Sequence, residues 1–229
     1  MADAEQGQDG PKLFAPLPDP SRDRRLVFHR HLAELARLAG ADLPAEGRLD
    51  GREWERHARK RTRQALSGLG ELPERLFAPL LRAAVHDPNP SFNRQFVEPA
   101  VTAFGRRRVR TALISSLRTG SNEERAGAAR AWYWTQVPLQ YRAGSSEPTP
   151  ESRAEWEATA ELDAEWQEAA LREFVANEEL DVRRCLLPGL WLDPRRHRAD
   201  LHDLVAEAVR IARGHSDEYL RHRVEVQIG

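Results

Sequence analysis

The absence of a strand pattern is the feature that most constrains what this chain can fold into. No segment places four or more β-branched residues in strict alternation, as a half-buried strand would. Apolar residues recur instead at three- and four-residue spacing, for example at Leu32, Leu35 and Leu38. Because the chain is rich in Ala, Leu, Arg and Glu, which all favour helix, we predict an all-α protein.

Capping and breaking residues set the expected helix boundaries. Ser21 is a suitable N-cap and Gly40 a suitable C-cap for the first helix, and the two prolines within residues 87–90 require a turn. Residues 138–150 contain three prolines, so we predict a long loop there, either functional or disordered. The expected helices span residues 21–39, 50–67, 72–86, 91–104, 106–118, 122–136, 151–176, 179–192, 200–213 and 216–226.

The predicted helices come in pairs whose sequences resemble one another. An offset of 58 residues places Leu113 over Leu171 and Arg125 over Arg183, and an offset of 38 carries Arg183 to Arg221. A repeated unit of an apolar helix, a polar turn and a second helix with an early Arg would explain these matches. Such units bury their apolar faces by stacking on their neighbours. Chance is the alternative, because helices rich in Leu and Arg align easily with themselves.

This pattern resembles the HEAT-like repeat families of α-solenoids over roughly residues 75–226. The residues that carry the resemblance are Leu113, Leu117 and Arg125, then Leu171, Val175 and Asp181-Val182-Arg183, then Val209, Asp217 and Leu220-Arg221. In these families an Arg early in the second helix bridges to an Asp or Asn at the turn. Arg94, Arg125, Arg183 and Arg221 fall at the Arg position, whereas Thr119 and His215 replace the turn residue. The resemblance implies a HEAT-like right-handed solenoid of antiparallel helix pairs with a surface that binds other macromolecules.

The expected organisation of the chain has three parts. Residues 1–20 are predicted to form a disordered Pro-rich tail, with a short strap docked through Leu13, Phe14 and Leu17 as the alternative. Residues 21–70 are predicted to form a helical N-terminal extension. Residues 71–229 are predicted to contain the HEAT-like helical repeats, interrupted by the loop at 138–150.

The expected binding groove combines arginine with tryptophan. The triplet Trp132-Tyr133-Trp134 cannot face one core, because consecutive helical residues point about 100° apart. At least one ring therefore faces the groove or packs under the 138–150 loop, and exposed aromatic residues beside Arg are typical of binding hot spots. The candidate groove residues are Arg94, Arg125, Arg130, Trp132, Trp134, Arg183 and Trp191. They favour a non-enzymatic interaction module or scaffold whose groove binds a protein partner.

Charge is distributed unevenly along the chain. Residues 147–181 contain twelve Asp and Glu against two Arg, a formal charge of −10, and because the whole chain carries −1 the remainder carries +9. This acidic segment is either a solvated helix face or a docking site for a basic partner. The candidate basic patch is Arg106, Arg107, Arg108 and Arg110, and further basic clusters lie within residues 56–63 and 195–198.

Basic clusters attract phosphate, so nucleic-acid binding is the alternative function. The AlkD-like alkylpurine DNA glycosylases are built from HEAT-like repeats at about this size. The Trp and Asp arrangement expected of those enzymes is not found in this sequence. The analogy therefore holds at the level of the fold only.

Several classes of protein find no support in the sequence. No apolar run approaches the ~18 residues that span a bilayer, and the N-terminus lacks the apolar region of a secretory signal. The single cysteine, Cys185, excludes an internal disulfide, the histidine spacings indicate no metal site, and no catalytic motif occurs. We expect a cytoplasmic protein that needs no cofactor, and the sequence favours a non-enzymatic role while leaving an enzyme as the alternative. Only Lys12 and Lys60 among the 35 Lys and Arg residues are lysine, which favours a GC-rich bacterial source.

Overall fold

The computed structural model describes residues 14–15, 22–44, 50–138, 140–142 and 144–229. It is all-helical, with 74% helix, and in these residues the only strand-like feature is one antiparallel bridge between Tyr141 and Pro148. The predicted all-α class is confirmed. None of the described helices combines the length and the apolar character required to traverse a lipid bilayer.

Eleven α-helices form in the described part of the chain, and side-chain caps begin several of them. The carboxylate of Asp50 accepts the backbone N–H groups of Arg52 and Glu53, and Ser121 forms a capping box with Glu124. The α-helices are α1 (Arg22–Ala39), α2 (Gly51–Gly68), α3 (Phe77–His86), α4 (Arg94–Phe104), α5 (Arg106–Thr119), α6 (Asn122–Tyr133), α7 (Pro150–Glu157), α8 (Ala160–Ala176), α9 (Leu180–Leu186), α10 (His202–Gly214) and α11 (Glu218–Ile228). Short 3-10 helices are η1 (Glu74–Leu76), η2 (Leu187–Gly189), η3 (Pro194–Arg196) and η4 (Ala199–Leu201).

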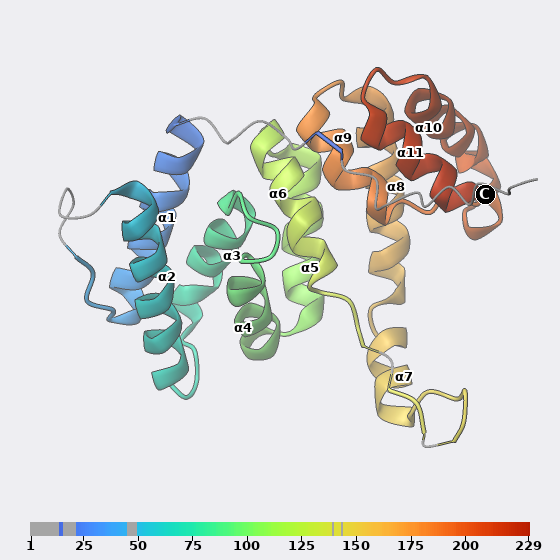
Figure 1. Ribbon diagram of the computed structural model, residues 1–229. Coiled ribbons are helices and arrows are strands. Elements are labelled where there is room, and N and C mark those ends of the chain that lie inside the picture. Colours follow the sequence, from blue (N-terminus) through green and yellow to red (C-terminus); the bar gives the residue numbers. More distant parts are fainter. Residues whose placement is uncertain (1–13, 16–21, 45–49, 139, 143) are drawn as a thin grey trace, which may run out of the picture.

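The helices pack as two rows of neighbours (Figure 1). In one row α1 contacts α3, α3 contacts α6, and α6 contacts α9. In the other row α4 contacts α5, α5 contacts α8, and α8 contacts α10. Successive helices such as α1 and α2, α3 and α4, α5 and α6, and α10 and α11 pack across the two rows. One hydrophobic core therefore extends from Phe28 in α1 to Val224 in α11.

Two predicted helices are interrupted in the structure, and the predicted helices 91–104 and 122–136 are each three residues too long, because α4 begins at Arg94 and α6 ends at Tyr133. The predicted helix 151–176 breaks at residues 158–159 into α7 and α8, and the carbonyl oxygens of Ala158 and Thr159 accept hydrogen bonds from Arg107 and Arg110 of α5. The predicted helix 179–192 ends at Leu186 and continues only as the single turn of η2, because Pro188 cannot continue a helical hydrogen-bond ladder. Residues 190–193, between η2 and η3, are therefore extended rather than helical.

The acidic segment 147–181 finds its basic partners within the same chain. Six of its carboxylates pair with arginines of α5 and α6. The pairs are Arg106–Glu155, Arg107–Glu161, Arg110–Asp163, Arg118–Glu165, Arg125–Glu173 and Arg130–Asp181. Because the partners follow the same order along α5 and α8, these two helices run in the same direction. Ion pairs made by the segment 147–181 thus contribute to the contact between α8 and α5.

The prediction for residues 1–20 lies almost entirely outside the described residues. Phe14 and Ala15 are described, and they contact the opposite end of the chain. The Phe14 ring centroid lies 5.5 Å from that of Tyr219 and 5.0 Å from that of His222, both in α11. The carbonyl of Ala15 accepts a hydrogen bond from Arg184 in α9 at 2.8 Å. These two residues form a strap contact between the N-terminal segment and the last helices.

The 138–150 loop, together with α7, extends away from the other helices (Figure 1). The Ser152 hydroxyl donates to the carbonyl of Gln140 at 3.2 Å, and the Thr149 hydroxyl accepts the backbone N–H of Ser152. Together with the bridge between Tyr141 and Pro148, these bonds tie the described part of the loop to the start of α7.

A histidine pair at the contact of α1 with α3 should make stability depend on pH. The rings of His31 and His86 stack with centroids 4.5 Å apart, and burial lowers the pKa of each. The unfolded chain therefore takes up protons first as the pH falls below about 6.5, which favours unfolding. The neighbouring Glu124, 3.8 Å from His86, offsets only part of this effect.

We expect the melting temperature to decrease between pH 7.5 and 5.5, as measured by circular dichroism. The variant His86→Gln removes one titrating ring and should show a smaller decrease over the same range. Equal decreases in the variant and the unmodified protein would contradict this assignment.

Candidate functional site

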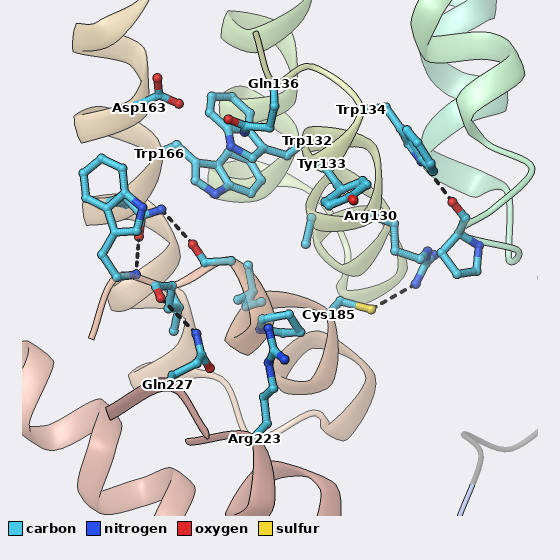
Figure 2. Close-up of a pocket in the computed structure, with 18 of the residues that line it drawn as sticks. Arg130, Trp132, Tyr133, Trp134, Gln136, Asp163, Trp166, Cys185, Arg223 and Gln227 are labelled. Atoms are coloured by element: carbon cyan, nitrogen blue, oxygen red, sulfur yellow. Dashed lines mark hydrogen bonds between the residues drawn. The ribbon is translucent and has the colours of Figure 1, made fainter. Parts of the chain in front are cut away.

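A pocket of about 670 Å³, here called the aromatic pocket, is the candidate site because it gathers four tryptophans and three arginines, whereas a second pocket, of about 810 Å³ between α2 and α4, contains no aromatic residue. Figure 2 shows its lining side chains converging from the C-terminal end of α6, from α8 and from the α9–α11 region. Pro90 and Ser91, which precede α4, close one edge. The pocket therefore joins segments that lie more than a hundred residues apart in the sequence.

Tryptophan rings form the walls of the aromatic pocket. Trp132 of α6 and Trp166 of α8 stack in parallel, with ring centroids 4.2 Å apart, and both are buried (Figure 2). Trp134 is held at the edge, because its indole N–H donates to the carbonyl of Pro90 at 3.0 Å. Tyr133 packs edge-on against Trp134 and is 68% exposed. The three consecutive aromatic residues thus divide between a buried wall and an exposed rim.

Two glutamines hold the extended segment that forms the opposite wall. Gln167 of α8 donates to the carbonyl of Gly189 at 2.8 Å and accepts the backbone N–H of Trp191 at 2.9 Å. Gln227 of α11 donates to the carbonyl of Leu190 at 3.2 Å. Because helix stops at Gly189, these side chains replace the backbone partners that a helix would supply. These hydrogen bonds hold the backbone at Leu190 and Trp191, and the Trp191 side chain lines the pocket.

Three arginines line the aromatic pocket, and their partners differ. Arg130 of α6 lies 3.6 Å from Asp181 and has only 10% of its side chain exposed. The Arg196 guanidinium lies 3.9 Å from the ring centroid of Trp191. Arg223 of α11 forms no ion pair with any described residue. The single lining carboxylate, Asp163, is bonded to Arg110 at 3.1 Å.

Cys185 lines the aromatic pocket but is suited to structure rather than to nucleophilic chemistry. Its thiol accepts a hydrogen bond from Arg130 at 3.3 Å and donates to Asp181 at 3.5 Å. Burial raises its pKa to about 11, so the thiolate that attack requires is scarce near neutral pH.

The structure brings together four of the seven candidate groove residues, namely Arg130, Trp132, Trp134 and Trp191. Arg94 is adjacent, with its guanidinium 5.1 Å from the Trp134 ring centroid. Arg125 and Arg183 are not lining residues of this pocket. Arg125 pairs with Glu173 at 2.9 Å, and the buried Arg183 donates to the carbonyl of Phe174.

Several residues that line the aromatic pocket were not among the site residues predicted from the sequence. Tyr133 belongs to the aromatic triplet and Arg196 to a basic cluster, so both carried a signal. Trp166 lies in the acidic segment that was considered as a docking site for a basic partner, with a buried anchor as the alternative, and it is buried. Gln167, Arg223 and Gln227 lie on helices where nothing in the local pattern distinguishes them from core or surface positions.

The arginines of the candidate basic patch are all engaged by groups of the same chain. Arg106 bonds Glu155 and Arg107 bonds Glu161, while Arg108 bonds Glu74 and lies over the ring of Phe77. Arg110 is 1% exposed. These contacts balance the charge of cations placed at the start of α5, where the helix dipole alone would disfavour them.

No group of three or more His, Cys, Asp or Glu side chains among the described residues could hold a metal ion. Searches of protein-family models, of curated proteins and of solved structures find no match to this chain. The function of the aromatic pocket is therefore inferred from the chemistry of its lining residues.

Proposed function

We propose that this protein is a non-enzymatic interaction module that binds a segment of a protein partner at the aromatic pocket. The observation that carries the proposal is the convergence of exposed and buried aromatic side chains with arginine in one concavity. Aromatic residues and Arg dominate the binding energy of protein interfaces, particularly where a rim excludes water from a buried centre. Tyr133 and Trp134 supply such a rim around the stacked Trp132 and Trp166.

We further propose that the helices form a HEAT-like right-handed solenoid. The two rows of helices and the common direction of α5 and α8 support this arrangement. One departure is that α4 and α5, which are consecutive, lie in the same row, so the order of the rows reverses there. Such stacked pairs present extended surfaces that suit the binding of macromolecules.

The chemistry of the lining residues supports binding rather than catalysis. The Cys185 thiol has a raised pKa, and Asp163 is committed to Arg110. Neither side chain therefore offers the activated nucleophile or the positioned base that group transfer requires.

Nucleic-acid binding remains the second candidate, and one observation favours it. Arg56, Lys60, Arg61 and Arg63 are exposed on α2 and form no ion pair with any described residue. Phosphate binding by this surface would give an affinity for duplex DNA that decreases steeply with salt. Undetectable binding at ~150 mM salt is the result that our proposal requires.

Site-specific photo-crosslinking tests the proposed function. A benzophenone amino acid placed at Tyr133 should form a covalent adduct with a partner protein in the cells that make this chain. The same group placed at Leu26, an exposed residue of α1, is the matched control and should form none. The change Trp191→Ala should abolish the adduct at position 133 while leaving the circular dichroism spectrum unchanged. Equal adduct yields at positions 133 and 26 would rule out the aromatic pocket as the docking site. So would an adduct at position 133 whose yield is unchanged by Trp191→Ala.

A further inference from the structure

The aromatic pocket contains more positive charge than its own carboxylates balance. Arg196 and Arg223 have no carboxylate partner among the described residues, whereas Asp163 and Asp181 are engaged by Arg110 and Arg130. The guanidinium of Arg196 is instead spread over the Trp191 ring, with its planar edge available to an acceptor. The pocket thus offers two cations, the exposed Arg196 stacked on Trp191 and the half-buried Arg223.

Buried polar atoms in the same pocket lack hydrogen-bond partners. They are Nε of Arg130, Nε of Arg223 and Oε1 of Gln227, all from lining residues. A buried donor without an acceptor costs free energy, and the cost is larger for a charged group. Arg223 also has no ion pair with any described residue, so an acceptor brought by a ligand to its guanidinium would supply a partner that these residues do not. A carboxylate suits the task because it can accept from guanidinium groups with two oxygens.

The surroundings of the aromatic pocket disfavour a polyanion as its occupant. Helix α8, which contributes Trp166 and Gln167, belongs to the segment 147–181, where arginines of α5 and α6 pair with only six of the twelve carboxylates. A nucleic-acid backbone would bring many phosphates close to this segment. A single carboxylate on a peptide can instead contact the arginines, while an adjacent apolar side chain packs against the tryptophan rings.

Phe14 and Ala15 are already held by similar chemistry on α9 and α11. Phe14 packs on Tyr219, and the Ala15 carbonyl accepts from Arg184. Tyr219 lies one helical turn before Arg223 on the same face of α11, because residues four apart are neighbours on a helix surface. An aromatic side chain together with an arginine–oxygen bond is therefore a mode of peptide capture that these helices support.

We infer that the aromatic pocket has an anion subsite, made by Arg196 and Arg223, and that its occupant is an acidic peptide segment. The segment places its carboxylates on these arginines and an adjacent apolar or aromatic side chain against Trp166 and Trp191. The inference rests on the proposed function and adds to it the chemistry of the partner.

The tryptophans provide a direct test. Of the six in the chain, Trp132, Trp134, Trp166 and Trp191 line the pocket, whereas Trp54 and Trp156 do not. The protein is labelled with 5-fluorotryptophan, and its fluorine resonances are assigned with single Trp→Phe variants. Two capped tetrapeptides are titrated, Phe-Glu-Leu-Glu and the matched amide Phe-Gln-Leu-Gln. We expect the acidic peptide to shift the pocket resonances and to spare those of Trp54 and Trp156. The amide peptide should bind about tenfold more weakly or worse.

Arginine variants identify the subsite. Arg196→Gln and Arg223→Gln should each reduce the affinity for the acidic peptide toward that of the amide peptide. Arg195→Gln is the matched control, because Arg195 is 89% exposed, pairs with Asp193 and lies one residue from Arg196. It should leave the affinity unchanged, and circular dichroism should show that all three variants are folded.

Other outcomes overturn the inference. Equal affinity for both peptides, or no shift with either peptide, would show that no anion subsite exists. Tighter binding of an oligothymidylate than of the acidic peptide at ~150 mM salt would identify the occupant as nucleic acid. An adduct at Tyr133 together with equal peptide affinities would leave the proposed function intact, so the two failures are distinguishable.

Discussion

Replacing Gly127 by alanine should lower the free energy of unfolding by about 3 kcal/mol. Gly127 lies in the middle of α6, where α6 packs against α3. A Cβ atom at this position would lie 1.8 Å from the carbonyl oxygen of Val85 and 2.7 Å from its carbonyl carbon. Because the obstacle is helix backbone, the two helices must move apart. The gain of about 1 kcal/mol in helix propensity from Gly to Ala cannot offset this clash.

Thermal unfolding followed by circular dichroism measures the effect, and a loss of this size corresponds to roughly 6–12 °C in a domain of this length. Gly214→Ala is the matched control, because Gly214 is the last residue of α10 and a Cβ there meets nothing within 4 Å. Its melting temperature should stay the same or rise slightly. Equal melting temperatures for the two variants would mean that α3 and α6 do not approach as closely as described.

The close approach at Gly127 shows why helices were easier to predict than their packing. Helix boundaries depend on nearby residues, such as the cap at Ser121 and the break after Asp87, so they can be deduced from the sequence. Gly127 gives only a local signal, a small loss of helix propensity, while its role depends on Val85, 42 residues away. The break between α7 and α8 was missed for the same reason, since it depends on Arg107 and Arg110 of α5.

The charged segments were likewise predictable only in part. The acidic character of residues 147–181 follows from counting, but the partner of this segment does not. Three of the four arginines considered as a surface for phosphate, Arg106, Arg107 and Arg110, bond carboxylates about 50 residues further along the chain, and Arg108 bonds Glu74. Only the packing of α5 against α8 reveals that the two charged segments are complementary.

The aromatic pocket was predictable where its residues are unusual. Consecutive aromatic residues at 132–134 cannot all be buried in one core, which singled them out. Arg223 and Gln227 are ordinary residues of an amphipathic helix, and they become lining residues only because α11 packs beside α9. Arg125 and Arg183 shared a repeat position with Arg94, but each bonds a different internal partner.

The variant Arg110→Met should lower the free energy of unfolding by about 3–5 kcal/mol, because it leaves a half-buried charge without compensation. Arg110 is 1% exposed and donates to the Thr135 carbonyl at 3.2 Å, to the Thr159 hydroxyl at 3.1 Å and to Asp163 at 3.1 Å. Its guanidinium also lies 4.8 Å from the ring centroid of Trp132, which stacks on Trp166. Near-ultraviolet circular dichroism should therefore change along with the stability.

Arg118→Met provides the matched comparison, since Arg118 pairs with Glu165 on the same two helices but is half exposed. Exposed ion pairs contribute about 1 kcal/mol or less, so this variant should unfold nearly as the unmodified protein does. Adding Asp163→Asn to Arg110→Met removes the uncompensated carboxylate and should restore part of the lost stability. A loss equal to that of Arg118→Met, or no recovery in the double variant, would show that the buried pair does not hold α5 to α8. Recovery of stability without recovery of the near-ultraviolet spectrum would show in addition that Arg110 itself orders the tryptophan wall of the aromatic pocket.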